Sequence, residues 1–66
     1  MNLSEAIAAI AAGHKVRASN GGLFWLEHDK RGPVLMGEPA GYGKPIKHVV
    51  FSSEHFAPTI TWEIFE

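Results

Sequence analysis

The first part of the chain has the spacing of an amphipathic helix. Its apolar positions recur at i, i+4, i+7 and i+8, which places them on one helix face. These positions are Leu3, Ile7, Ile10 and Ala11. Ser4 is a candidate N-cap, and Asn2 is its rival because Glu5 stands three residues later, as in a capping box. Gly13 predicts the end of the helix, since glycine adopts a left-handed conformation at little cost.

Beyond this helix the pattern changes to short apolar stretches separated by turn residues. Such stretches predict β-strands, and glycine- and proline-rich segments predict the turns between them. We expect strands over residues 15–18, 23–27, 34–36, 46–51 and 59–65. We expect turns over residues 19–22 and 28–33, an exposed loop over residues 37–45, and one helical turn over residues 52–58. Ser52 and Ser53 are both candidate caps of that helical turn, and Pro58 ends it.

The alternation within these strands predicts which side chains point toward the core. Val16 points inward from the first strand, while Thr61 and Glu63 point outward from the last. The inward side chains of the last strand are Ile60, Trp62 and Ile64. In residues 46–51 we expect one face to carry Ile46, His48 and Val50 and the other to carry Lys47, Val49 and Phe51. Residues 23–27 are apolar on both faces, as in a central strand or one covered by a partner.

Together these elements predict an α+β fold made of a single compact domain, residues 1–66. One N-terminal helix packs on a small antiparallel sheet of four or five strands. A core of this size rarely supplies more than about 3–5 kcal/mol. The chain has no cysteine, so disulfides are excluded, and 45% of its residues are hydrophobic. We therefore expect a homo-oligomer, in which another copy covers part of the apolar surface.

The charge balance disfavours several classes of partner. The formal net charge is −1, whereas nucleic-acid binders usually carry a basic footprint. No stretch approaches the roughly 18 apolar residues of a membrane span. We expect a cytoplasmic protein that binds neither membranes nor nucleic acid. The four histidines lack a short metal-ligand spacing, and no nucleophile elbow or H-E-x-x-H pair is present. We therefore expect no bound metal, no cofactor and no enzymatic activity.

Several residues are candidates for ligand binding. Lys15 and Arg17 stand two positions apart on a predicted strand, so they share a face about 7 Å apart. They fit either a solvated edge strand or an anion site, because arginine offers a planar fork to phosphate. Trp25 fits core packing, an interface or stacking on a base. Tyr42 and Lys44 lie in the glycine-rich loop, which is either a flexible connection or a ligand-contacting loop.

Both ends of the chain resemble a family of short phage and prophage proteins. Its members open with a serine or threonine before "EA", run through a helix to "GKKVRR" and close with a "DWEIVE"-like strand. The family includes the second type of Thoeris anti-defence protein, a sponge for cyclic ADP-ribose-type signals. The matching positions are Leu3, Ser4, Glu5, Ala6, Gly13, Lys15, Val16, Arg17, Trp62, Glu63, Ile64 and Glu66. Members commonly continue with another basic residue and a tryptophan, where this chain has "ASNGG".

The resemblance implies a phage-encoded counter-defence protein of the host bacterial cytoplasm that sequesters a nucleotide-derived immune signal without chemistry. It implies a homo-oligomer with pockets between protomers. Phosphates would contact Arg17 and Lys44, a base would stack on Trp25 or Tyr42, and ribose hydroxyls would reach Asn20. The alternative is an anti-CRISPR-type inhibitor that binds a host defence protein directly through aromatic anchors.

Overall fold

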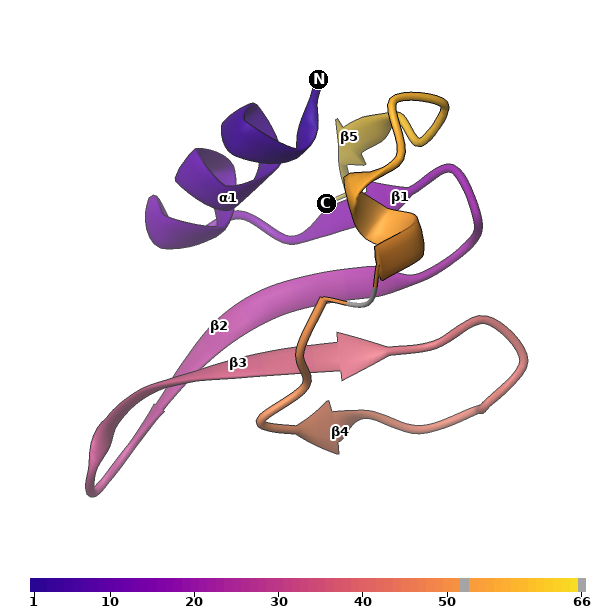
Figure 1. The fold of residues 1–66 in the computed structure, drawn as a ribbon. Coiled ribbons are helices and arrows are strands. Elements are labelled where there is room, and N and C mark those ends of the chain that lie inside the picture. The colour runs from indigo at the N-terminus through magenta and orange to yellow at the C-terminus, as the bar shows by residue number, and fades with distance from the viewer. Residues whose placement is uncertain (52, 66) are drawn as a thin grey trace.

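A computed structural model describes residues 1–51 and 53–65. In these residues one helix packs on a five-stranded antiparallel sheet, so the predicted α+β fold is confirmed (Figure 1). The elements are α1 (Leu3–Ala11), β1 (Val16–Ala18), β2 (Leu23–Asp29), β3 (Gly32–Glu38), β4 (Ile46–Lys47), the 3-10 helix η1 (Ser53–Phe56) and β5 (Trp62–Ile64). No helix among them is long and apolar enough to span a membrane.

The sheet has the strand order β4-β3-β2-β1-β5, so the strand that is last in sequence lies beside the first. β2 is the central strand, as its apolar composition on both faces predicted. β5 pairs with β1 in antiparallel register, with Arg17 opposite Glu63 and Ala18 opposite Trp62. The outer edge of β5 exchanges backbone hydrogen bonds of 3.0 and 3.1 Å with Met1. The two ends of the chain therefore lie side by side (Figure 1).

The helix begins and ends through local interactions that the sequence pattern predicted. Asn2, and not Ser4, is the N-cap: its Oδ1 accepts from the backbone nitrogen of Glu5 at 2.8 Å. The Glu5 carboxylate in turn accepts from the backbone nitrogen of Asn2 at 3.0 Å, which completes the capping box. Gly13 follows the last turn with φ of +100°, where a side chain would be strained.

The β2–β3 hairpin is longer than predicted, because its turn is shorter. Asp29 pairs with Gly32, which leaves only Lys30 and Arg31 as loop residues, where a turn over residues 28–33 was expected. The Asp29 carboxylate accepts from the backbone nitrogen of Arg31 at 2.7 Å, and Gly32 takes φ of +115°. Pro33 lies within β3, a position it tolerates where its missing N–H is not required by the ladder.

The prediction of a strand over residues 46–51 is wrong beyond Lys47. His48 takes φ of +56°, and this left-handed residue ends β4 after two positions. The chain then turns so that Val49 packs toward the core, while Val50 is 78% exposed. The expected sharing of one face by Ile46, His48 and Val50 therefore does not occur. Gly37 makes room for Val49, since a Cβ there would lie 2.8 Å from a Val49 methyl carbon.

The C-terminal segment contains the expected helical turn and a shorter strand. η1 covers Ser53–Phe56, within the predicted residues 52–58, and the candidate cap Ser52 lies outside the described residues. β5 spans only Trp62–Ile64 of the predicted residues 59–65. Trp62 is buried as expected, but Ile64 is 48% exposed. Ile64 belongs to the edge strand of the sheet, where it has a neighbouring strand on one side only.

The core lies between the sheet and the helices α1 and η1. We call the sheet face that they cover the covered face. Its buried cluster contains Ala6, Ile10, Val16, Ala18, Phe24 and Trp62. Four rings meet there with centroids 5.0–5.8 Å apart, those of Phe24, Phe51, His55 and Trp62. Neighbouring residues of a strand point to opposite faces, so Arg17, Trp25 and Glu63 belong to the other side, which we call the open face.

Candidate ligand-binding face

The open face is organised in rows that run across the strands. The register places Glu63, Arg17, Leu23 and Glu38 in one row. Continuing the register by one residue places Lys15 beside Trp25, which is followed by Met36 and Lys47. Phe65 adjoins this second row, because its backbone nitrogen donates to Lys15 O at 2.7 Å. Val34 and Met36 are buried among these neighbours, so the face has a small apolar base beneath its charged side chains.

Lys15 and Trp25 form the first part of the candidate site. The Lys15 Nζ lies 4.5 Å from the centroid of the Trp25 ring, within the range of a cation–π contact. The Trp25 indole N–H donates to Glu27 Oε2 at 2.8 Å, which fixes the orientation of the half-buried ring. A hollow of about 380 Å³ lies here. It is lined by Gly13, Lys15, Trp25, Leu26 and Phe65.

Arg17 belongs to the neighbouring row of the open face and contacts Phe65, one of the residues that line this hollow. Its guanidinium carbon lies 5.1 Å from the centroid of the Phe65 ring. Its Nε donates to Glu63 Oε1 at 2.9 Å, and its Nη2 donates to the same oxygen. Both side chains of this ion pair are exposed, at 46% and 60%. Exposed pairs stabilise a fold by only about 0.2–1 kcal/mol, so the guanidinium can exchange partners at small cost.

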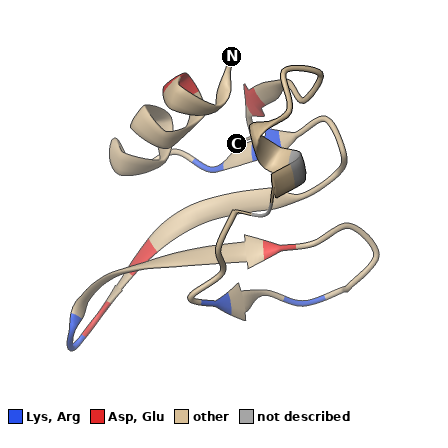
Figure 2. Ribbon diagram, in the orientation of Figure 1, with Lys and Arg blue, Asp and Glu red and all other residues tan. Residues whose placement is uncertain are grey.

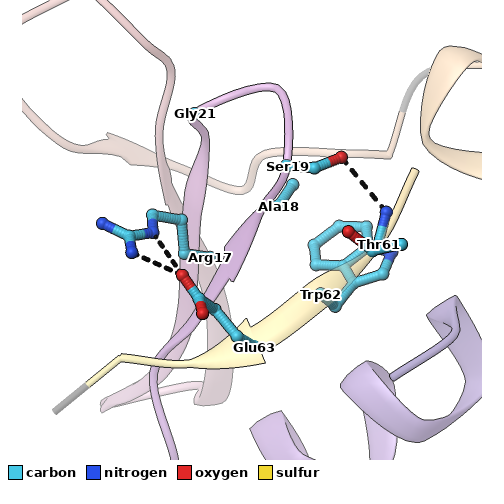
Figure 3. Close-up of a pocket in the computed structure, with 7 residues that line it drawn as sticks. All are labelled: Arg17, Ala18, Ser19, Gly21, Thr61, Trp62 and Glu63. Atoms are coloured by element: carbon cyan, nitrogen blue, oxygen red, sulfur yellow. Dashed lines mark hydrogen bonds and ion pairs between the residues drawn. The ribbon is translucent and has the colours of Figure 1, made fainter. Parts of the chain in front are cut away.

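A second hollow of about 490 Å³ lies beside Arg17 (Figure 3). It is lined by Arg17, Ala18, Ser19, Gly21, Thr61, Trp62 and Glu63. The Ser19 hydroxyl accepts from the backbone nitrogen of Thr61 at 3.1 Å and keeps its own hydrogen for donation. A guanidinium and two hydroxyls therefore line one polar hollow, a donor set that suits phosphate or sugar oxygens. In Figure 2 the basic residue of β1 stands beside the acidic residue of β5, as the pairing of Arg17 with Glu63 requires.

The predicted ligand residues fall into two groups. Lys15, Arg17 and Trp25 come together on the open face. Asn20 lies in the β1–β2 turn, where its Oδ1 accepts from the backbone nitrogen of Gly22 at 3.3 Å. It lines a different, largely apolar cavity of about 360 Å³, whose other walls include core residues such as Phe24 and Val49. Asn20 is therefore separated from the cations of the open face.

The glycine-rich loop forms a third location. Tyr42 and Lys44 lie in the connection between β3 and β4, and the Lys44 Nζ is 6.0 Å from the centroid of the Tyr42 ring. Neither side chain is among those that line the hollows beside Lys15 and Arg17.

Five residues of the open face that line the two hollows or bind the Trp25 ring were not among the sequence-predicted ligand residues: Ser19, Glu27, Thr61, Glu63 and Phe65. The sequence held part of the information needed to find them, since the alternation in the last strand predicted that Thr61 and Glu63 point outward. The pattern did not indicate that this strand would pair with β1. That pairing is what brings Glu63 to Arg17 and Phe65 to Lys15.

The open face carries hydrogen-bond donors and aromatic rings. Among residues 1–51 and 53–65, no three His, Asp or Glu side chains are grouped so that they could hold a metal ion. Comparisons of the chain with known protein families, curated protein sequences and solved structures give no match.

Proposed function

We propose that this protein binds a nucleotide-derived immune signal on the open face and sequesters it without chemistry. The observation that carries the proposal is the position of Arg17. Its guanidinium contacts the Phe65 ring, which lines one hollow, and itself lines the other. A ligand laid along this face would place a phosphate at Arg17 and Ser19, and a base against Trp25 or Phe65.

The counter-defence role comes from the resemblance of the chain ends to phage proteins. A phage protein that hides a signal in the host cytoplasm must compete with the host effector for it. An affinity in the nanomolar range, about −12 kcal/mol, is then required. Sequestration needs no catalytic group. It needs reversible contacts, and the ion pair and cation–π contacts of the open face are reversible. Trp25 is already held by Lys15 and Glu27, which lowers the cost of ordering a stacking platform.

The proposed assembly is a homo-oligomer. Trp25 is half-buried, Phe65 is 42% exposed, and neither α1 nor η1 covers their side of the sheet. A second copy packed beside these rings would enclose the ligand pocket and add the apolar burial that a small core lacks. It would also allow the loop of one copy to supply Tyr42 and Lys44 beside the Lys15 and Arg17 of another. Shared pockets of this kind would unite ligand residues that are separated within one chain.

Native mass spectrometry of the protein purified from bacteria tests this proposal. We expect an oligomer that retains a few hundred daltons of extra mass per pocket, or that gains it when cyclic nucleotides are added, and that releases the ligand unaltered on denaturation. Arg17→Ala should abolish the added mass, whereas Lys30→Ala, which removes a cation at the hairpin tip, should not. A chain that stays monomeric and binds no member of the nucleotide panel would overturn the proposal.

Direct inhibition of a host protein is the second candidate function. The observation that favours it is a set of exposed apolar side chains on the helical side of the molecule, with Phe56 at 66% and Ile7 at 46% exposure. Large exposed apolar side chains are typical anchors of protein interfaces. Capture of one defence protein from a host lysate, lost in Phe56→Ser and kept in Arg17→Ala, would support this function over sequestration.

A further inference from the structure

We infer that Glu63 is a specificity-determining residue that competes with the ligand for Arg17. This inference rests on the proposed function, since it concerns the phosphate end of the same site. Glu63 lies directly opposite Arg17 in the β1–β5 register, so the strand pairing holds the two side chains together. The carboxylate occupies the guanidinium that a phosphate would use, and a ligand must displace it.

The way in which the pair is made favours displacement by phosphate. The Arg17 Nε and Nη2 both donate to the single oxygen Oε1 of Glu63. A phosphate group presents several oxygens, and can place one on each of these two donors in the fork-to-fork arrangement that arginine favours. The exchange replaces one shared acceptor with two separate ones. It also releases an exposed ion pair that contributes little to the stability of the fold.

Displacement does not remove the carboxylate from the site. The backbone pairing keeps Glu63 beside Arg17, and its side chain lines the same hollow as Ser19 and Thr61. The displaced carboxylate therefore stands close to the bound phosphate and repels it in proportion to the ligand's charge. Arg17 and Glu63 thus set a threshold of binding energy. An anionic ligand stays bound only if its contacts with the guanidinium, the hydroxyls and the rings outweigh this repulsion.

The threshold explains how a site with two cations avoids filling with simple anions. Free phosphate meets the repulsion of Glu63 and has no base to place against Trp25 or Phe65. A nucleotide has both parts, and its ring contacts offset the cost of displacing the carboxylate. We therefore assign to Glu63 the discrimination between a nucleotide and the inorganic anions of the cell.

Binding of inorganic phosphate to four variants tests the role of Glu63. The measurement is a titration followed by the phosphorus NMR signal of phosphate in all four variants. In the variants that keep Arg17, the signal of its Nε–H also reports a change of partner at the guanidinium itself. Glu63→Gln keeps the shape of the side chain and removes its charge, so phosphate should bind roughly five- to tenfold more tightly than to the unmodified protein. Glu63→Asp keeps the charge, and should bind phosphate within about threefold of the unmodified protein.

A matched control removes an equal charge from the same row of the open face. Glu38 is two strands away from Arg17, about 10 Å by the spacing of strands. Glu38→Gln should therefore change phosphate affinity by less than about twofold. The double variant Arg17→Ala with Glu63→Gln should lose the gain, because the repulsion matters only where the guanidinium holds the anion.

The outcomes separate this inference from the proposed function. If Glu63→Gln binds phosphate no more tightly than the unmodified protein, or if the gain survives the loss of Arg17, the role assigned to Glu63 is wrong. A gain of equal size in Glu38→Gln also overturns it, since the effect would then be one of net charge. If phosphate behaves as expected but no nucleotide binds to the unmodified protein, Glu63 competes for Arg17 and the proposed function fails.

Discussion

The two tryptophans lie on opposite faces of one sheet and differ in almost every respect. Trp62 is 4% exposed on the covered face, where its ring packs against Phe24, Phe51 and His55. Trp25 is half-buried on the open face, with Lys15 over its ring and Glu27 on its N–H. One ring is surrounded by rings and the other by charges. Burial therefore makes the first a source of stability, and exposure beside cations makes the second available to a ligand.

This small chain divides its apolar residues unequally between the two faces of the sheet. α1 and η1 lie over one face only, so the hydrophobic contribution to stability is concentrated there. The open face carries charged side chains above a narrow apolar base of Val34 and Met36. Its charged contacts are exposed and individually weak, which suits partner exchange more than stability. Changes on the two faces should therefore separate into effects on folding and effects on binding.

The largest effect on folding is expected from Trp62→Ala. Removing a buried aromatic side chain costs about 3–5 kcal/mol, which equals the whole contribution expected of so small a core. The variant should be largely unfolded by circular dichroism at 25 °C. Trp62→Phe is the control: it keeps a ring in the cluster and removes an indole N–H that has no hydrogen-bond partner among the described residues. Trp25→Ala should cost only roughly 1–2 kcal/mol. Equal losses of stability in the two alanine variants would contradict the different roles of the two tryptophans.

Gly37→Ala should be the next largest change, and it tests the packing that replaced the predicted strand. A Cβ at this position would lie 2.8 Å from Val49 Cγ1 and 3.2 Å from the Phe24 ring. Overpacking of this kind costs roughly 1–3 kcal/mol, measurable by urea denaturation. Adding Val49→Ala should relieve part of the clash, so the double variant should be less destabilised than the sum of the single changes. Simple additivity would show that Val49 does not pack on Gly37.

Asn2→Ala should reduce stability by about 1 kcal/mol, because it removes the side-chain half of the capping box. Ser4→Ala provides the matched control within the first turn of α1, where Ser4 is exposed and does not cap the helix. Its effect should stay within about 0.5 kcal/mol. Thermal unfolding of the two variants ranks them directly. The reverse ranking would show that the helix begins at the rival cap.

The smallest effect on stability is expected from Arg17→Ala, although it should have the largest effect on ligand binding. The Arg17–Glu63 pair is exposed, so its loss should change the free energy of unfolding by less than about 1 kcal/mol. The same change should remove the nucleotide-dependent rise in melting temperature that we expect for the unmodified protein. A melting temperature that falls by ten degrees or more without ligand would contradict the division between the two faces.

Most of the elements could be predicted because their signals are local. The Asn2–Glu5 spacing, the glycine after the helix and the alternation of Trp62 and Glu63 each act within a few residues. The failures occurred where a local pattern met a nonlocal contact. Residues 46–51 alternate like a strand, yet His48 turns the chain so that Val49 fills the space above Gly37. A packing contact between distant segments thereby overrides the propensity of a short apolar run.

The candidate site shows the same division. Strand parity predicted that Lys15 and Arg17 share a face, whereas the position of Trp25 beside them follows only from the register of β1 with β2. The five additional residues became visible only in three dimensions. Asn20 provides a contrast, since it lies close in sequence to Arg17 but its side chain lines a cavity of the covered face. Sequence proximity therefore does not indicate on which face of the sheet the side chain of a turn residue lies.

The capped helix, the glycine that ends it and the inward direction of Val16 follow from residue types within a few positions of the sequence. These depend on hydrogen bonds and backbone conformations within a few residues, which the residue types specify directly. The tertiary structure was needed to show that β5 lies beside β1, that Glu63 meets Arg17 and that α1 and η1 pack on the same face of the sheet. Strand order depends on the summed burial of segments far apart in the chain, and no local pattern contains that sum.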